Sequence, residues 1–218
     1  MRKRSKVDPQ DTGEFVPAAR GRQWKPKNAA QSRLWDTITA NTVTFVLGPA
    51  GTAKTHTSMA WALDAVRRSQ YERIVLTRPI VTATEDLGFL PGDITSKISP
   101  FHRPQTEIAG KIDKTIPIEM VPLAFLRGVT LEDSICIGDE FQNATANQLR
   151  LYLSRLGGGS KMVVCGDTAQ SDIHSSGLYA VAKAMIGLED VGVFEFTDDD
   201  IVRHPLIGSM LNRIEGVH

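Results

Sequence analysis

The sequence contains few cysteines, no long hydrophobic run and no recognisable secretory signal. Its 218 residues include two cysteines, Cys136 and Cys165, and each lies in an apolar stretch typical of a buried strand. Two thiols in such stretches argue against a disulfide framework and indicate a reducing compartment. No apolar stretch approaches the roughly 18 residues that a bilayer span requires, and the basic N-terminus lacks the apolar segment of a secretory signal. We therefore expect a cytoplasmic protein that does not enter a membrane.

The sequence also lacks histidines at metal-ligand spacing, and it lacks a net charge. The five histidines show no ligand spacing, which argues against a zinc site. The formal net charge is zero, but the charge is unevenly distributed, because residues 1–27 contain eight Lys or Arg and three acidic residues. Proline and glycine also recur there, so we expect a basic, largely irregular N-terminal arm. Such an arm is either solvated and disordered or in contact with nucleic acid.

Strands and helices alternate along residues 28–218, which we expect to form a single domain. Apolar runs predict strands at 43–47, 73–77, 134–138, 161–165 and 191–196, and helical periodicity predicts helices at 28–39, 54–68, 147–156, 176–186 and 205–213. This alternation predicts a three-layer α/β fold, with helices on both faces of a mainly parallel central sheet. Residues 79–133 interrupt the pattern with a long proline-containing region, and a region of that length within a compact domain is usually functional.

The best-defined motif lies between the first predicted strand and the helix that follows it. Residues 48–55 read GPAGTAKT, which follows the apolar run VTFVL and precedes a helical segment. A strand, a glycine-rich turn and a helix that begins at Lys-Thr form the phosphate-binding loop (P-loop) of nucleoside triphosphatases. The backbone N–H groups of such a loop and the positive end of the helix bind phosphate oxygens. The expected nucleotide-binding residues are Gly48, Pro49, Ala50, Gly51, Thr52, Ala53, Lys54 and Thr55.

Three residues of this loop carry separate expectations. Lys54 should contact the β- and γ-phosphates as a mobile point charge, and Thr55 should place its hydroxyl on Mg²⁺. Ala53 departs from the GxxxxGK[ST] pattern, which has glycine before the lysine. A methyl group is tolerated there if the backbone is helical and is costly if φ is positive. We predict a helical Ala53, because Lys54 already belongs to the first turn.

Acidic and amide side chains follow the third and fourth predicted strands. Asp139 should bind Mg²⁺ beside Thr55, and Glu140 should orient and deprotonate the attacking water as a general base. Gln170 is positioned to hydrogen-bond the γ-phosphate or the water and thereby sense hydrolysis. Asp167 either supports the Mg²⁺ shell or caps a turn. These side chains meet the P-loop because the carboxyl ends of parallel strands share one edge of a sheet.

Three arginines lie where a phosphate or a partner could approach. Arg203 follows three aspartates and is the best candidate for an arginine finger, which neutralises charge that develops during phosphoryl transfer. The alternative is an ion pair with those aspartates. Arg78 and Arg127 lie in the turn contexts Arg-Pro and Arg-Gly. Each of them contacts a nucleic-acid backbone, contacts a neighbouring subunit or forms a salt bridge.

Longer motifs together resemble the PhoH-like family of ATPases, which is related to the core of superfamily-one helicases. They follow one another in order and cover nearly all of the chain from residue 28 onward. The motifs are GPAGTAKT (48–55), LTRPIV (76–81), EDLGFLPGD (85–93), KISPFHRP (97–104), PLAFLRGVTL (122–131), IGDEFQNAT (137–145), QLRLYLSRLGGGSKMVVCGDTAQSD (148–172), SGL (176–178) and DIVRHPL (200–206).

The resemblance implies a RecA-like P-loop fold, hydrolysis of ATP with Mg²⁺, and action on RNA or single-stranded DNA. It implies that Gln31 contacts adenine as a helicase Q-motif glutamine does, whereas spacing alone makes Gln31 a surface residue of a helix. Relatives often carry Gly in place of Ala53 and Ala in place of Phe141, so these two residues bear on turnover. Helicases of this type build the nucleotide cleft between two RecA-like domains, and this chain has length for one. We therefore expect a homo-oligomer, a hexameric ring, in which a neighbour supplies Arg203.

Three functions fit these motifs. The leading hypothesis is an ATPase that couples hydrolysis to remodelling or unwinding of RNA or single-stranded DNA. The alternative is an ATP-dependent switch or scaffold that hydrolyses slowly and moves no strand. A small-molecule kinase shares the P-loop, but Glu140 and Gln170 would activate and sense water, which a kinase must exclude.

Overall fold

The computed structural model describes residues 24–79, 116–167, 176–201 and 213. Most of the expected N-terminal arm, most of the proline-containing region at 79–133 and nearly all of the helix expected at 205–213 therefore lie outside the described residues.

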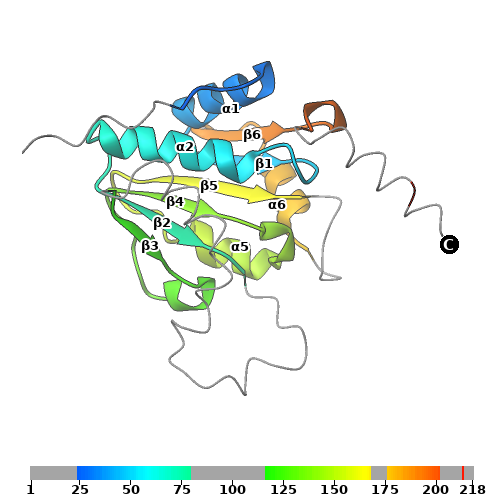
Figure 1. Ribbon diagram of the computed structural model, residues 1–218. Helices are drawn as coiled ribbons and strands as arrows, with labels where there is room; N and C mark the ends of the chain where they lie inside the picture. Colours follow the sequence, from blue (N-terminus) through cyan, green and yellow to red (C-terminus); the bar gives the residue numbers. More distant parts are fainter. Residues whose placement is uncertain (1–23, 80–115, 168–175, 202–212, 214–218) are drawn as a thin grey trace, which may run out of the picture.

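A six-stranded sheet forms the centre of the described chain (Figure 1). Its strands lie in the order β3-β2-β4-β5-β1-β6, and every pair is parallel. The bounds are β1 Val43–Leu47, β2 Arg73–Thr77, β3 Ile118–Met120, β4 Ser134–Gly138, β5 Lys161–Gly166 and β6 Val191–Glu195. The predicted parallel α/β architecture is confirmed, and each of the five predicted strands lies within one residue of its expected ends.

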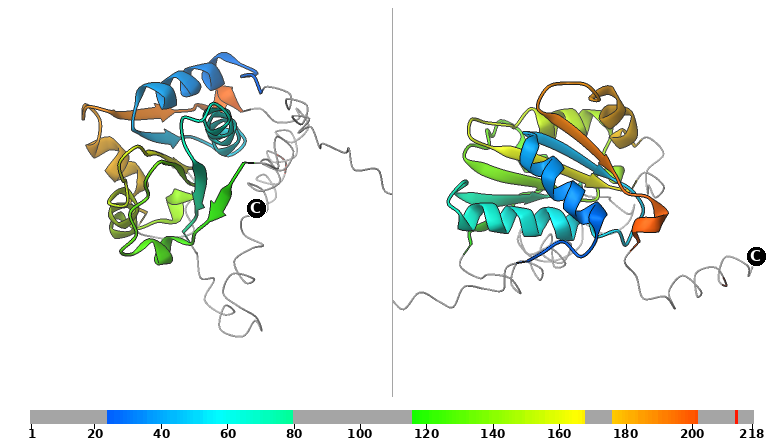
Figure 2. Two further views of the ribbon diagram at one scale, coloured as in Figure 1. Left: turned by 90° about the vertical axis from the view of Figure 1, so that its left-hand side faces the viewer. Right: turned by 90° about the horizontal axis from the view of Figure 1, so that it is seen from above.

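Helices cover both faces of this sheet and produce the three predicted layers. Helices α1 (Ala29–Ala40) and α2 (Lys54–Arg67) lie against one face, and α5 (Ala146–Leu153) and α6 (Leu178–Ala184) lie against the other (Figures 1 and 2). Because successive strand residues point to opposite faces, Val46 packs with α1 and α2, whereas Phe45 and Leu47 pack with α5 and α6. A strand buried on both faces needs apolar residues at every position, which explains the continuous apolar runs in the sequence.

Side chains fix both ends of α1. The Asn28 side chain caps its first turn by accepting a hydrogen bond from the N–H of Gln31 at 2.9 Å. At the other end, the ammonium group of Lys161 donates to three carbonyl oxygens, those of Ile38, Thr39 and Asn41. A cation is favourable there because the carboxyl end of a helix carries partial negative charge. Lys161 thereby fixes α1 to the first residue of β5.

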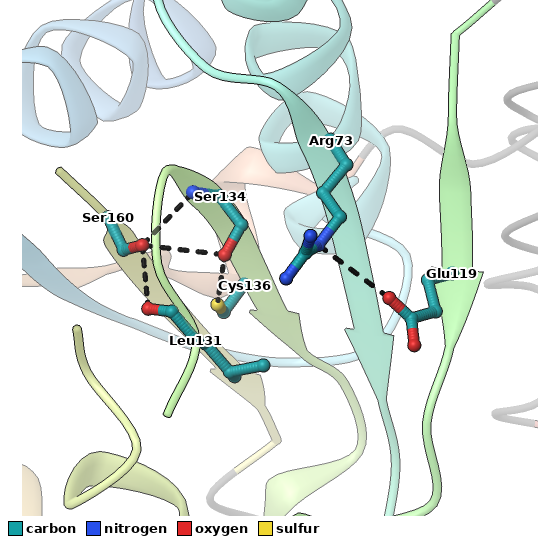
Figure 3. Close-up of polar contacts among 6 residues, drawn as sticks. All are labelled: Arg73, Glu119, Leu131, Ser134, Cys136 and Ser160. Carbon is teal, nitrogen blue, oxygen red and sulfur yellow. Dashed lines mark hydrogen bonds and ion pairs between the residues drawn. The ribbon is translucent and has the colours of Figure 1, made fainter. Parts of the chain in front are cut away.

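Polar contacts also tie together the amino ends of the strands (Figure 3). The Ser160 hydroxyl donates to the carbonyl oxygen of Leu131 at 2.8 Å and accepts from the N–H of Ser134 at 3.0 Å. Arg73 of β2 pairs with Glu119 of β3 at 3.6 Å. These contacts join the start of β4 to the start of β5, and β2 to β3, at the edge opposite to the P-loop.

The structure departs from the sequence predictions chiefly within residues 79–133. Strand β3 was not expected there, because it has three residues, follows a proline and exposes two of its side chains. A short 3-10 helix, η2 (Leu123–Leu126), follows it. Helix α1 has the predicted length but lies one residue further along the chain, whereas α2 and α5 are shorter than predicted, and the helix expected at 176–186 is reduced to α6.

Two expectations drawn from what the sequence lacks can also be compared with the structure. Both cysteines are buried and free, as predicted. Within the described ranges, none of the helices has the length and apolar character that crossing a bilayer requires.

Candidate nucleotide site

Three strands end at the same edge of the sheet and bring the predicted residues together. The P-loop follows β1, Asp139 and Glu140 follow β4, and Asp167 follows β5, which lies between β1 and β4. A pocket of about 330 Å³ opens at this edge. It is lined by Ala50, Gly51, Ala53, Lys54, Thr55, His56, Asp139, Glu140, Gln142, Gly166 and Asp167.

The P-loop holds its shape through close backbone packing. Gly48 has φ +135°, and a Cβ at this position would lie 2.7 Å from both Cβ and the carbonyl oxygen of Phe196. Only glycine fits there, because it lacks a side chain and tolerates positive φ. The buried hydroxyl of Thr52 donates to the carbonyl oxygen of Pro49 at 2.9 Å. Thr52 therefore closes the turn from inside and leaves the outer side of the loop to the pocket.

The prediction of a helical Ala53 is wrong. Ala53 is the N-cap of α2 and has φ +66° and ψ +31°, which is the left-handed region. The helix begins one residue later, at Lys54, so the turn before it must reverse the backbone. This conformation costs a residue with a Cβ roughly 1–2 kcal/mol. The glycine of the general pattern is thus explained, and this chain carries a strained alanine in its place.

Lys54 lies across the P-loop, close to the acidic residues of the pocket. Its ammonium group donates to the carbonyl oxygens of Gly48 at 2.6 Å and of Pro49 at 2.8 Å. Burial lowers the pKa of Lys54, and the nearby carboxyl groups, Asp167 foremost among them, act in the opposite direction. A phosphate group at this position would add a further anionic partner for this partly desolvated ammonium.

Thr55 and Asp139 form the direct contact between the P-loop and β4. The hydroxyl of Thr55 donates to Oδ1 of Asp139 at 2.5 Å, and Asp139 is buried. Magnesium ions in nucleotide sites bind oxygen ligands, typically one or two protein groups together with phosphate oxygens and water. A hydroxyl and a carboxylate side by side at the pocket wall fit this ion, and Mg²⁺ binding by these two residues stays a prediction.

Glu140 has an unusual backbone and two side-chain partners. Its φ of +56° places it in the left-handed region, immediately before the 3-10 helix η3 (Phe141–Asn143). Its Oε1 pairs with Arg78 at 3.1 Å, and its Oε2 accepts from the side-chain amide of Gln142 at 2.6 Å. The other end of that amide accepts the backbone N–H of Asp167 at 3.0 Å. A chain of contacts therefore joins the ends of β2, β4 and β5.

Phe141 points away from this pocket, into the core beneath β4. Its ring is fully buried and packs against Tyr152 of α5, with the ring centroids 4.9 Å apart. The same ring fills the space beside Gly138, where an added Cβ would lie 2.5 Å from it. Phe141 supports the turn that carries Asp139 and Glu140, and it does not occupy the volume available to a nucleotide.

An aromatic cluster at the start of α2 borders the pocket and was not predicted. His56 lines the pocket, and its Nε2 accepts a hydrogen bond from the indole N–H of Trp24 at 3.0 Å. Trp24 stacks on Trp35 of α1, with the ring centroids 5.5 Å apart. Because an indole only donates, His56 must be unprotonated at Nε2 in this arrangement. Burial, and to a lesser degree Lys27, lowers the pKa of His56 and favours that neutral form.

Gln31 lies at the start of α1 but outside the group of described residues that line the pocket. It is 1% exposed, so the surface position expected from spacing is wrong. Its side-chain oxygen accepts the backbone N–H of Lys27 at 2.8 Å. This contact fixes the segment that enters α1, and an adenine contact for Gln31 stays a prediction.

Of the remaining predicted residues, the structure places Arg78 and Arg127. Gln170 and Arg203 lie outside the described residues. Arg127 lines a separate cavity of about 340 Å³ between η2 and α5. Arg78 lies at the pocket edge through its pairing with Glu140. A salt bridge was one of the three alternatives predicted for Arg78, but its partner was not, because nothing in a turn context such as Arg-Pro shows that β2 lies beside β4.

Comparison with known sequences agrees with this geometry. The sequence model of the family described as "PhoH-like protein" matches residues 23–215. A PhoH-like protein of Mycobacterium tuberculosis (strain ATCC 25618 / H37Rv) is 43% identical over 209 residues, which are 90% of this chain and 59% of that protein. A PhoH-like protein of Bacillus subtilis (strain 168) is 38% identical over 211 residues, 91% of this chain and 66% of that protein. The chain thus spans less than two thirds of the length of these relatives.

Comparison with solved structures supports the fold. The large terminase of a thermophilic bacteriophage, solved in complex with ADP, has a TM-score of 0.57 and 12% sequence identity. The likeness covers 86% of this chain and 50% of the terminase chain. At this identity the match shows the RecA-like P-loop fold alone. From the sequence match over nearly its whole length, together with the P-loop and its acidic partners on a parallel sheet, we conclude that the chain belongs to the PhoH-like protein family.

Proposed function

We propose that this chain binds ATP together with Mg²⁺ in the 330 Å³ pocket and hydrolyses it. One observation carries the proposal, the 2.5 Å hydrogen bond from Thr55 to Asp139. It joins the P-loop to β4 at the wall that also carries Lys54 and Glu140. A binding group for phosphate, two oxygen ligands for a cation and a carboxylate base then face one volume, as phosphoryl transfer to water requires.

Each residue contributes a distinct action in this proposal. The N–H groups of the P-loop and the ammonium of Lys54 bind the phosphates and orient them. Thr55 and Asp139 would hold Mg²⁺, which neutralises charge on the phosphate oxygens. The carboxylate of Glu140 orients a water molecule and accepts its proton. Phe141, buried under this turn, keeps Glu140 on the pocket side of β4.

Two substitutions test the proposed site. Lys54→Ala should abolish nucleotide binding or turnover, because the cation that binds the phosphates is removed. Glu140→Gln should keep ATP bound and lower turnover by about 10²–10⁴-fold, because the amide has the same size but cannot accept a proton. Steady-state phosphate release and binding of a fluorescent ATP analogue measure the two effects. The exposed residues Lys183 and Glu132 give matched controls, Lys183→Ala and Glu132→Gln, which should behave as the wild type.

Normal turnover by Glu140→Gln would show that the base is wrongly assigned. Normal turnover by Lys54→Ala would contradict the whole site.

The proposal extends to the partner of the chain: ATP hydrolysis is coupled to remodelling or unwinding of RNA or single-stranded DNA. The family to which the chain belongs and the basic character of residues 1–27 support it. Residues 28–218 would act as one ATPase domain, in a homo-hexameric ring whose neighbouring subunit supplies Arg203. The two buried free thiols suit a reducing compartment, the cytoplasm.

A slow ATP-dependent switch that moves no strand is the second candidate. The observation that favours it is the engagement of Glu140 by Arg78 and Gln142, since an occupied carboxylate is a poor base for water. Phosphate release measured with and without single-stranded RNA separates the two functions. Stimulation by RNA supports the remodelling enzyme, and indifference to both RNA and single-stranded DNA supports the switch.

A further inference from the structure

The carboxylate of Glu140 is directed at protein groups through both of its oxygens. Oε1 pairs with a terminal guanidinium nitrogen of Arg78 at 3.1 Å, and Oε2 accepts from the Gln142 amide at 2.6 Å. A general base must instead place an oxygen within about 2.6–3.2 Å of the water whose proton it takes. In this arrangement both oxygens of the proposed base are bound to donors of the protein itself.

The backbone at Glu140 fixes the direction in which its side chain leaves the main chain. The residue has φ +56°, and the next residue, Phe141, is locked in the core against Tyr152. Gln142 is fixed in turn, because its side-chain oxygen Oε1 accepts the backbone N–H of Asp167 at 3.0 Å. Of the two donors to Glu140, Gln142 is thus built into the scaffold, whereas Arg78 reaches the carboxylate from a neighbouring strand.

Arg78 is also the partner that an external anion can reach. Its side chain is 26% exposed and that of Glu140 is 37% exposed, so water and solutes have access to the pair. Ion pairs with this exposure are weak, because solvent and salt screen them. Guanidinium binds phosphate oxygens through paired N–H donors at least as well as it binds a carboxylate. A chain of phosphodiesters is therefore an effective competitor for Arg78.

We propose that Arg78 is a positioning residue that restrains Glu140, and that a phosphate of single-stranded nucleic acid releases Glu140 by binding the Arg78 guanidinium. The inference rests on the proposed function and names how the same site is regulated. Nucleic acid bound at the end of β2 is thereby coupled to the base at the end of β4, the neighbouring strand. Arg78 acts on hydrolysis only through the position of Glu140.

The test compares basal and RNA-stimulated phosphate release in wild type, Arg78→Gln and a matched control. The control is Arg73→Gln, because Arg73, the first residue of β2, also pairs with a glutamate, Glu119, and lies at the end of the strand opposite to Arg78. Poly(U) is the probe. Arg78→Gln should raise basal release by about five- to tenfold, the lower range of coupling between two sites. Poly(U) should then add little, while Arg73→Gln keeps the wild-type basal rate and the wild-type stimulation.

A double variant and a salt titration show whether the effect passes through Glu140. In Arg78→Gln combined with Glu140→Gln, the rise in basal release should disappear. In the wild type without poly(U), basal release should increase as salt rises from about 0.05 to about 0.5 M, because salt screens the exposed pair. The salt titration needs no substitution, so it tests whether the ion pair restrains Glu140 even where Arg78→Gln folds poorly.

Several outcomes would overturn the inference. Lower basal release in Arg78→Gln with unchanged nucleotide affinity would mean that Arg78 assists the reaction. Undiminished stimulation of Arg78→Gln by poly(U) would mean that nucleic acid acts elsewhere. Activation that follows protein concentration and ignores poly(U) would assign Arg78 to a neighbouring subunit.

Failure of the proposed function gives a different result. Phosphate release that is absent, or that persists in Lys54→Ala, contradicts hydrolysis at this site and the restraint together. Release that depends on Lys54 but is indifferent to Arg78 contradicts the restraint alone.

Discussion

The left-handed alanine before the P-loop lysine is the clearest example of local strain in the described chain. Ala53 has φ +66° at a position where glycine would be unstrained. Relief of about 1–2 kcal/mol of strain is partly offset by the greater freedom of glycine in the unfolded chain. We therefore expect Ala53→Gly to raise the free energy of unfolding by about 0.5–1 kcal/mol, as measured by urea denaturation.

Ala180→Gly provides the matched control for that change. Ala180 is an exposed residue inside helix α6, where glycine should lower stability by about 0.5–1 kcal/mol. Opposite signs for the two substitutions would confirm the backbone at Ala53. A loss of stability in Ala53→Gly as large as in the control would contradict it.

The hydrogen bond between Trp24 and His56 predicts a dependence of stability on pH. Burial lowers the pKa of His56 in the folded protein below its ordinary value of 6.5, so the unfolded chain takes up the proton first. The stability that neutral His56 contributes is therefore fully present above pH 6.5. It is lost as the pH falls through the lowered pKa of His56 in the folded protein. Thermal unfolding of wild type and His56→Gln should be measured at pH 7.5 and below pH 6.5. The wild type should lose more stability at the lower pH than His56→Gln does. An equal loss in both proteins would remove His56 from this role.

At the scale of elements, the turn after β4 depends on the aromatic packing beneath it. Phe141 is fully buried against Tyr152, whereas Phe125 in η2 is 52% exposed. Phe141→Ala should lower the free energy of unfolding by about 3–5 kcal/mol, because it removes a buried ring and leaves a cavity. Phe125→Ala should change it by at most about 0.5 kcal/mol, so urea denaturation of both variants measures the effect of burial. Similar small losses would show that the ring does not support the turn.

The sequence was sufficient to predict the elements whose signal is continuous and local. The apolar runs of β1, β2 and β4 and the turn GPAGTAKT are each contained in a few consecutive residues. Strand β3 lacked such a signal because it is short and half exposed. The helical backbone predicted for Ala53 was wrong although the helix begins at Lys54 as expected, because Ala53 is the N-cap, and an N-cap residue does not share the φ and ψ of the helix. Contacts such as Trp24 to His56 and Arg78 to Glu140 join distant segments, so they depend on the packed structure.

At the scale of the whole molecule, strand order decides which residues can act together. Strand β5 lies between β1 and β4, so the residues at its end, Gly166 and Asp167, separate the P-loop from Glu140 by one strand. Ligands bind at the carboxyl ends of parallel strands, where such loops meet. In the proposed ring, the described residues would form one side of the nucleotide site and a neighbouring subunit would form the other.

This arrangement predicts complementation between two inactive variants. Arg203→Ala subunits retain Glu140, and Glu140→Gln subunits retain Arg203, so mixed rings contain some sites with both residues. Mixing the two proteins should restore part of the phosphate release, and light scattering with ATP and Mg²⁺ should show an oligomer. A monomer that hydrolyses ATP at the full rate, or mixtures that stay inactive, would contradict a shared site.

The close contact between Gly48 and Phe196 has a mechanical consequence. The N–H of Phe196 bonds to the carbonyl oxygen of Leu47 at 2.9 Å, and its backbone fills the space beside Gly48. Tension applied to the chain beyond β6 would therefore reach the phosphate-binding turn directly, without passing through the core. A single-molecule pulling experiment anchored at residue 201 should weaken nucleotide retention at forces too small to unravel the sheet.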